Sequence, residues 1–292
     1  MLPRRTLIAW LIVCYAFLYL PIAFLIGFSF NDSRSVTAWS AVSLRWYGVL
    51  FHDEAMIDAA LLSLRIAAVS ASIALAIGTA SGLALARFGR FRGRAGFEAV
   101  LYAPLILPEV ITGLSLLLLF VVLEEAIGWP SGRGAGTVTI AHASVSVAYV
   151  AVVVRARLAD MGTVLEEAAA DLYAPPWKVF VLVTVPQLAP ALVSGWLLAF
   201  TLSLDDVVVA SFTSGPGATT LPMLVFSATR LGVTPEIYAL ATVIIGAVAG
   251  ASLAVWWLRG ITRRRADVPG VGRPESGPAR SPTASSGRLS SG

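Results

Sequence analysis

Six long runs of apolar residues dominate the chain and limit the folds open to it. Each run is roughly 17–25 residues long, enough for a helix to cross the hydrocarbon core of a bilayer. Inside a bilayer every backbone polar group needs an internal partner, so runs of this length predict helices. We therefore expect an all-α membrane protein with six transmembrane helices. The runs cover residues 7–30, 66–86 (or from residue 59), 99–123, 138–154, 188–212 and 237–258.

The composition agrees with a membrane protein and excludes several other classes. Hydrophobic residues make up 57% of the chain and charged residues 13%, against roughly 25% charged in a soluble domain. The net charge of +4 comes from arginines at the ends of the runs and in the tail, so no nucleic-acid partner is expected. Cys14 is the only cysteine, which excludes an internal disulfide. The first run exceeds a signal-peptide core and has no clear cleavage site, so we interpret it as a retained span.

The basic residues predict the orientation. Most of the 21 Lys and Arg residues lie on the side that holds both termini, the segment between the second and third runs, and the segment between the fourth and fifth. By the positive-inside rule this side is the cytoplasm. We predict one transmembrane domain over residues 1–265, with a cytoplasmic loop at about 156–187. Residues 266–292, rich in Pro, Gly, Ser and Arg, are predicted to form a disordered cytoplasmic tail near anionic lipid.

The loop between the fourth and fifth runs contains a polar, helix-forming stretch, residues 166–180. Thr163 lies three residues before Glu166, the spacing of a capping box. Pro175 and Pro176 stop the first helix, and Pro176 can begin the next. We predict a short helix, a break and a second helix. Because no soluble domain surrounds this stretch, it is typical of a docking element; an ordinary capped loop helix is the alternative.

Three acidic residues fall inside the apolar runs: Glu109, Asp205 and Asp206. A carboxylate near the bilayer centre costs roughly 2.5–3.5 kcal/mol on insertion scales, so these groups should face a bundle interior or a wet path. Asp205 and Asp206 point about 100° apart on a helix, so both can border one cavity. We interpret the three acids as a cation path. The alternative is that they cap broken helix ends or pair internally.

Several motifs are absent from the sequence. No His, Cys and Asp residues have metal-site spacing, and no Ser/His/Asp set is evident. A phosphate-binding loop needs G-x-x-x-x-G-K-S/T, yet the only lysine is Lys178, preceded by Trp177. We therefore expect no metal or cofactor on this chain. If ATP drives its function, another subunit hydrolyses the ATP.

The docking stretch resembles the EAA loop of ABC-importer permeases through Glu167-Ala168-Ala169, followed by Leu172, Ala174, Phe180 and Pro186. In that family the loop inserts into a groove of the ATPase as a coupling helix. The resemblance implies a set of ATPase-contacting residues here: Glu166, Glu167, Ala168, Ala169, Asp171, Leu172, Tyr173, Ala174 and Pro186. The family usually has glycine where Tyr173 stands. If the position needs a positive φ, tyrosine costs about 1 kcal/mol or more; otherwise the turn uses other dihedrals.

Longer segments are similar to the polyamine branch of these permeases, and most closely to the second permease subunit of putrescine importers. Among them are residues 46–48, 87–93, 110–120, 200–206, 215–223 and 235–242, so that the resemblance covers roughly residues 7–260. It implies a type I (MetI-like) fold in a bacterial cytoplasmic membrane. It also implies a sister permease, two copies of an ATPase that carries ATP and Mg, and a periplasmic polyamine-binding protein.

Three alternatives remain. The same machine could carry spermidine or another cationic solute. A secondary transporter or channel would show inverted repeats and ion-coordinating broken helices in both halves. An intramembrane enzyme would need a nucleophile–base set or a metal set.

Overall fold

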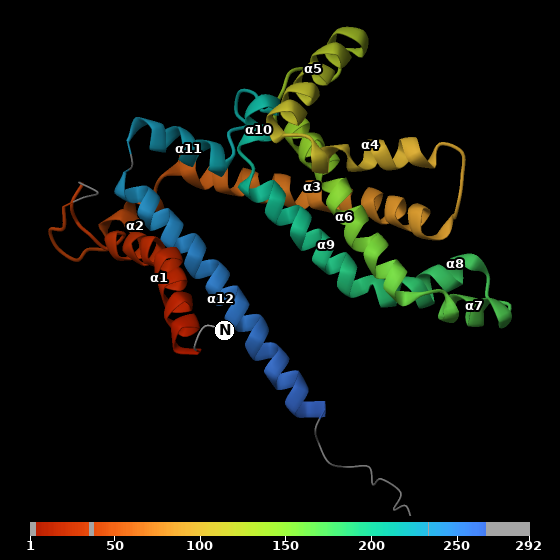
Figure 1. Ribbon diagram of the computed structural model, residues 1–292. Coiled ribbons are helices and arrows are strands. Elements are labelled where there is room, and N and C mark those ends of the chain that lie inside the picture. Colours follow the sequence, from red (N-terminus) through yellow and green to blue (C-terminus); the bar gives the residue numbers. More distant parts are fainter. Residues whose placement is uncertain (1–3, 35–37, 233, 267–292) are drawn as a thin grey trace, which may run out of the picture. The chain divides into compact units, whose positions relative to one another are not determined.

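The computed structural model describes residues 4–34, 38–232 and 234–266, and in this part of the chain the regular elements are helices, joined by turns and loops, with one isolated β-bridge between Asn31 and Val42. The elements follow one another as shown in Figure 1. They are α1 (Arg4–Phe28), α2 (Arg45–Leu50), α3 (Glu54–Arg87), α4 (Arg94–Ile106), α5 (Glu109–Ile127), α6 (Ala135–Met161), α7 (Val164–Asp171), α8 (Pro176–Val179), a π-helical turn (Phe180–Thr184), α9 (Val185–Asp205), α10 (Val208–Thr213), α11 (Leu221–Leu231) and α12 (Pro235–Ala266).

The prediction of an all-α chain with about six apolar helices is confirmed. Five helical stretches are long and apolar enough to cross a membrane: α1, α3, α5, α6 and the continuous stretch Pro176–Asp205. Pro235–Gly250, within α12, is a shorter apolar helix. Helix α6 extends beyond the predicted 138–154 at both ends, and its polar residues His142 and Ser146 are buried inside the protein.

For two of the six predicted spans, the prediction of a continuous helix is wrong. The span expected at 99–123 is divided into α4 and α5 at Leu107 and Pro108, which both have extended backbones. Proline cannot donate to the helical ladder and disfavours helix in the residue before it. The span expected at 188–212 is divided into α9 and α10 at Asp206, whose ψ is 129°. Here no proline is present, and the break follows from a side-chain cap.

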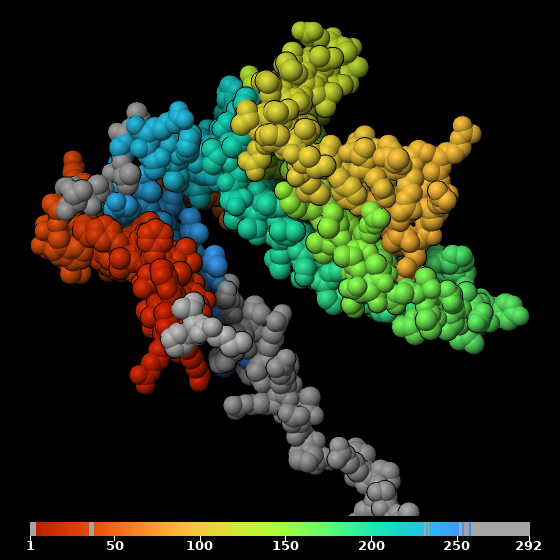
Figure 2. All heavy atoms as spheres, viewed as in Figure 1, coloured from red at the N-terminus to blue at the C-terminus, as the bar shows by residue number. Residues whose placement is uncertain are grey.

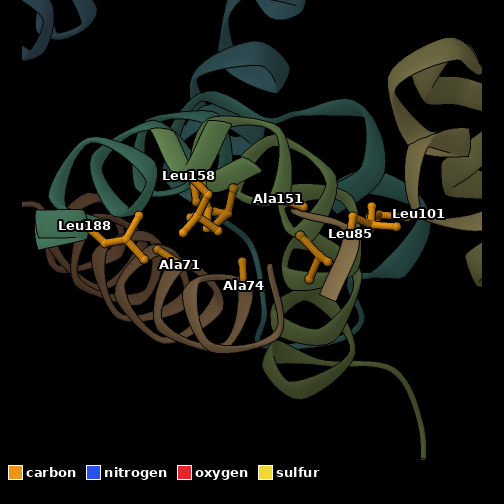
Figure 3. Close-up of a cluster of buried hydrophobic side chains, with 11 residues drawn as sticks. Ala71, Ala74, Leu85, Leu101, Ala151, Leu158 and Leu188 are labelled. Atoms are coloured by element: carbon orange, nitrogen blue, oxygen red, sulfur yellow. The ribbon is translucent and has the colours of Figure 1, made fainter. Parts of the chain in front are cut away.

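The core that positions the site is formed by α3, α6 and α9 packed against one another, with α4 alongside (Figure 3). Its buried side chains are mostly small or β-branched, which lets the helix backbones approach closely. A Cβ atom built on Gly78 would lie 2.7 Å from Cβ of Val150, so α3 and α6 meet where only glycine fits. The core residues are Ala71, Ala74, Leu85, Leu101, Val147, Val150, Ala151, Val154, Leu158, Leu188 and Ala199.

The chain separates after Thr242, inside α12, into two units, and all the residues of the site lie in the first. The predicted transmembrane domain over residues 1–265 stays a prediction. The predicted tail at 266–292 coincides, except for Ala266, with residues outside the described part of the chain.

Gly78→Ala should destabilise the protein by about 1–3 kcal/mol, because the new methyl group overpacks the contact between α3 and α6. The measurement is thermal unfolding of the purified protein in detergent. Gly96→Ala is the matched control: nothing lies within 4 Å of a Cβ there, and alanine improves helix propensity. Equal melting temperatures for the two variants would contradict the close packing.

Candidate functional site

Residues 163–184, termed the docking segment, lie beyond the ends of α6 and α9 (Figure 1). The expected helix, break and second helix are confirmed as α7, a turn and α8. The expected capping box is wrong. Thr163 stands at the N-cap position but makes no side-chain capping bond, and the Glu166 side chain bonds to Arg87 and Thr184 instead of reaching back to Thr163.

Glu166 is held by two residues from other elements. Its Oε1 atom accepts hydrogen bonds from Oγ1 of Thr184 (2.9 Å) and Nη2 of Arg87 (3.2 Å). Its Oε2 atom lies 3.0 Å from Nε of Arg87, which completes an ion pair. Both side chains are mostly shielded from solvent, so this pair is worth more than a typical surface salt bridge. Glu166 therefore anchors the docking segment to the bundle.

Arg87 also ties the ends of two long helices together. It lies in the last turn of α3 and donates to the carbonyl oxygens of Leu158 (3.3 Å) and Gly162 (2.6 Å) at the end of α6. A cation suits the carbonyl end of a helix, and an acid such as Glu166 suits the first turn of α7. One guanidinium group thus joins α3, α6 and α7. The sequence motif did not reveal Arg87 or Thr184; the only signal was a basic residue at the end of a span.

The docking helix α7 ends in a Schellman motif. The amide of Tyr173 donates to the carbonyl of Ala170 (2.9 Å). The amide of Ala174 donates to the carbonyl of Ala169 (3.2 Å). This places Tyr173 at the position that glycine usually fills. Its φ is +58°, so the position does need the left-handed conformation, and tyrosine carries a strain of about 1–2 kcal/mol there.

The other predicted coupling residues lie around this turn. Glu167, Ala168 and Asp171 are exposed on α7, as is Pro186 near the start of α9, while Ala169 and Ala174 are half-buried. Leu172 and Tyr173 are exposed by 83% and 96%. The green α7–α8 region is uncovered at the edge of its unit in Figure 2. The residues are therefore free to meet a partner, and their contact with an ATPase stays a prediction.

Asp206 caps the break between α9 and α10. Its Oδ1 atom accepts the amide of Val209 (3.2 Å), and its Oδ2 atom accepts the amide of Ala210 (2.7 Å). The carboxylate thereby satisfies backbone donors that the break would leave without partners inside the bilayer. The alternative that the acids cap broken helix ends thus describes Asp206 correctly.

His142, which is only 4% exposed, links this cap to two further helices. Its Nε2 atom lies 3.0 Å from Oδ2 of Asp206, and its Nδ1 atom lies 2.7 Å from Oγ of Ser203. Ser203 in turn accepts a hydrogen bond from Ser70 of α3 (3.0 Å). No Ser/His/Asp set is evident in the sequence, because His142 and Ser203 are 61 positions apart and meet only in the fold.

This Ser/His/Asp set holds helices together. Ser203 is 7% exposed, and its hydroxyl is bonded on two sides, to Ser70 and to His142. The Nδ1 atom of His142 shares a hydrogen bond with Ser203, while its Nε2 atom lies close to the Asp206 carboxylate without the geometry of a hydrogen bond. The network fixes the break at Asp206 against α3 and α6.

A small cavity of about 50 Å³ lies beside this network. Each of the two broken spans contributes a carboxylate to its lining: Glu109, from the first turn of α5, and Asp206. The other polar lining residues are His142, Ser146, Tyr149 and Ser203. Asp205 is exposed and lies outside the cavity lining. Two carboxylates beside hydroxyl groups can attract a cation. Among the described residues, no group of three or more His, Cys, Asp or Glu side chains could hold a metal ion.

Comparison with known proteins identifies close relatives. A profile of the family described as "Binding-protein-dependent transport system inner membrane component" matches residues 72–268, which include the docking segment and the cavity. The chain is 56% identical over 248 residues to the putrescine transport system permease protein PotI of Escherichia coli K12, covering 85% of this chain and 88% of that protein. It is 40% identical over 237 residues to the spermidine/putrescine permease protein PotC of Haemophilus influenzae, covering 81% and 90%.

Solved structures share the fold. A bacterial ABC transporter involved in alginate import matches with a TM-score of 0.67 at 16% identity, covering 89% of this chain and 98% of that chain. The methionine ABC transporter MetNI matches with a TM-score of 0.55 at 15% identity, covering 71% and 95%. The predicted type I (MetI-like) fold is confirmed.

Proposed function

The chain belongs to the binding-protein-dependent transport system inner membrane components, and on this premise we propose that it is a permease subunit of an ATP-driven importer that carries putrescine. The assignment of putrescine as the substrate rests on the 56% identity to PotI, which spans most of both chains. Putrescine is a small dication, and the acid-lined cavity offers charges of the opposite sign. The same machine carrying spermidine is the second candidate, supported by the 40% identity to PotC.

The proposed assembly contains partner proteins that supply functions for which this chain has no residues. The chain has no phosphate-binding loop, so an ATPase dimer would supply the energy, with ATP and Mg bound to it. A homologous sister permease would complete the membrane path, and a periplasmic polyamine-binding protein would deliver the solute. We place the assembly in the bacterial cytoplasmic membrane. Because of the distribution of arginines, we place both termini and the docking segment in the cytoplasm.

The proposed mechanism is alternating access driven through the docking segment. Movement of the ATPase would shift α7, and the Arg87–Glu166 pair would pass this shift to the ends of α3 and α6. These two helices also carry Ser70 and His142, which hold the break at Asp206. A shift of either helix therefore reaches the cavity, where ammonium groups would pass Glu109 and Asp206. Asp205 would act outside the cavity, on an exposed part of the same path.

The reconstituted importer tests this function. The chain and its sister permease are placed in vesicles with the ATPase, ATP and the binding protein, and uptake of labelled putrescine is measured. We expect uptake that stops when the ATPase is omitted, and that excess unlabelled putrescine suppresses more strongly than spermidine does. Uptake without the ATPase would contradict an ATP-driven importer, and stronger competition by spermidine would favour the second candidate.

Glu109→Gln should slow uptake in the same vesicles roughly tenfold, since loss of one charge contact worth about 1–2 kcal/mol changes a rate by that factor. Glu109 is exposed at the start of α5 and lines the cavity, so its amide replacement should leave folding intact. The matched control is Glu125→Gln, at the other end of α5 and outside the cavity lining. Equal uptake by the two variants would remove Glu109 from the cation path.

A further inference from the structure

Tyr173 brings a backbone strain that no burial against the described part of the chain offsets. It is the only residue other than glycine with a positive φ among those the structure describes. Glycine would form the same Schellman turn without strain. With 96% of the residue exposed, the ring gains almost no burial from its own chain. Strained residues that persist at a surface are typically held there by a functional contact.

The turn displays this ring rigidly. The hydrogen bonds of Tyr173 and Ala174 to the end of α7 fix the backbone on one side, and Pro175 restricts it on the other. Leu172 precedes the ring and is almost as exposed. An aromatic and an aliphatic side chain on a fixed turn lose little conformational entropy on binding, as interface anchors do.

Two exposed acids on α7 outnumber the one exposed base of α8, Lys178, and this balance indicates what covers the turn. Glu167 and Asp171 are exposed on α7, four residues apart and therefore on one face of the helix. Their carboxylates would be repelled by the anionic headgroups of a cytoplasmic leaflet. They suit a protein groove with an apolar floor and a basic rim. Membrane lipid is therefore the less favoured occupant of the docking segment.

We propose that Tyr173 is the anchor by which the docking segment selects its ATPase: its ring, with Leu172, fills an apolar pocket of that subunit, while Lys or Arg side chains at the rim face Glu167 and Asp171. The inference rests on the proposed function and adds to it a specificity-determining residue. An ATPase whose groove has evolved for glycine at this position would lack room for the ring.

Three substitutions separate the ring from the backbone strain. Tyr173→Phe keeps the ring, Tyr173→Ala removes the ring but keeps a Cβ at positive φ, and Tyr173→Gly removes both. The measurement is the dissociation constant between the permease pair and its ATPase, in detergent and in lipid nanodiscs. We expect Phe to bind within about threefold of the unmodified protein, and both Ala and Gly to bind about 10- to 30-fold more weakly. The control is Phe88→Ala, another exposed aromatic residue outside the docking segment, which should bind normally.

The glycine variant gives the deciding result. If Tyr173 only shapes the turn, glycine relieves strain and binds as tightly as tyrosine or more tightly, which would overturn the proposal. Weakening that appears in nanodiscs but not in detergent would assign the ring to lipid and also overturn it. Both results leave the proposed function standing, provided that the unmodified pair binds the ATPase. Failure of the unmodified pair to bind would remove the proposed function and the anchor together.

Discussion

The guanidinium group of Arg87 is the contact on which the working of this structure depends. It joins the ends of α3 and α6 to the first turn of α7, through two backbone carbonyls and one carboxylate. Without it, the docking segment would be joined to the bundle mainly by its covalent connections to α6 and α9. Helices α3 and α6 pack so closely that a Cβ atom built on Gly78 would lie 2.7 Å from Cβ of Val150, and we expect the two helices to move together. In the proposed mechanism, a force applied at α7 would therefore reach α3 and α6.

The bilayer sets the second constraint, because polar groups there must find partners within the protein. The break at Asp206 meets this demand with a carboxylate that accepts two amides and contacts His142. A hydrogen bond joins His142 to Ser203, and Ser70 extends the network to α3. The same carboxylate faces a cavity shared with Glu109. A group needed to stabilise a broken helix is thus placed where a cationic solute would feel its charge.

The sequence predicts what depends on local pattern and misses what depends on contacts between distant residues. Apolar runs predict the helices, and Pro175 and Pro176 predict the break in the docking segment. Thr163 and Glu166 have capping-box spacing, yet Glu166 finds a stronger partner in Arg87, 79 residues away. Because no proline or glycine lies at the break at Asp206, the run of apolar residues predicts a helix that continues through it. The family resemblance indicates that Tyr173 stands at a position with a possible positive φ. The backbone of the structure shows that φ there is positive.

The transmission through Arg87 is tested most directly by counting putrescine molecules imported per ATP hydrolysed in reconstituted vesicles. For Arg87→Ala we predict that ATP hydrolysis continues while this ratio falls several-fold, because the docking segment moves without carrying α3 and α6. Arg92→Ala, an exposed arginine in the loop after α3, should keep the ratio of the unmodified protein. An unchanged ratio for Arg87→Ala, at normal assembly of the complex, would contradict the account.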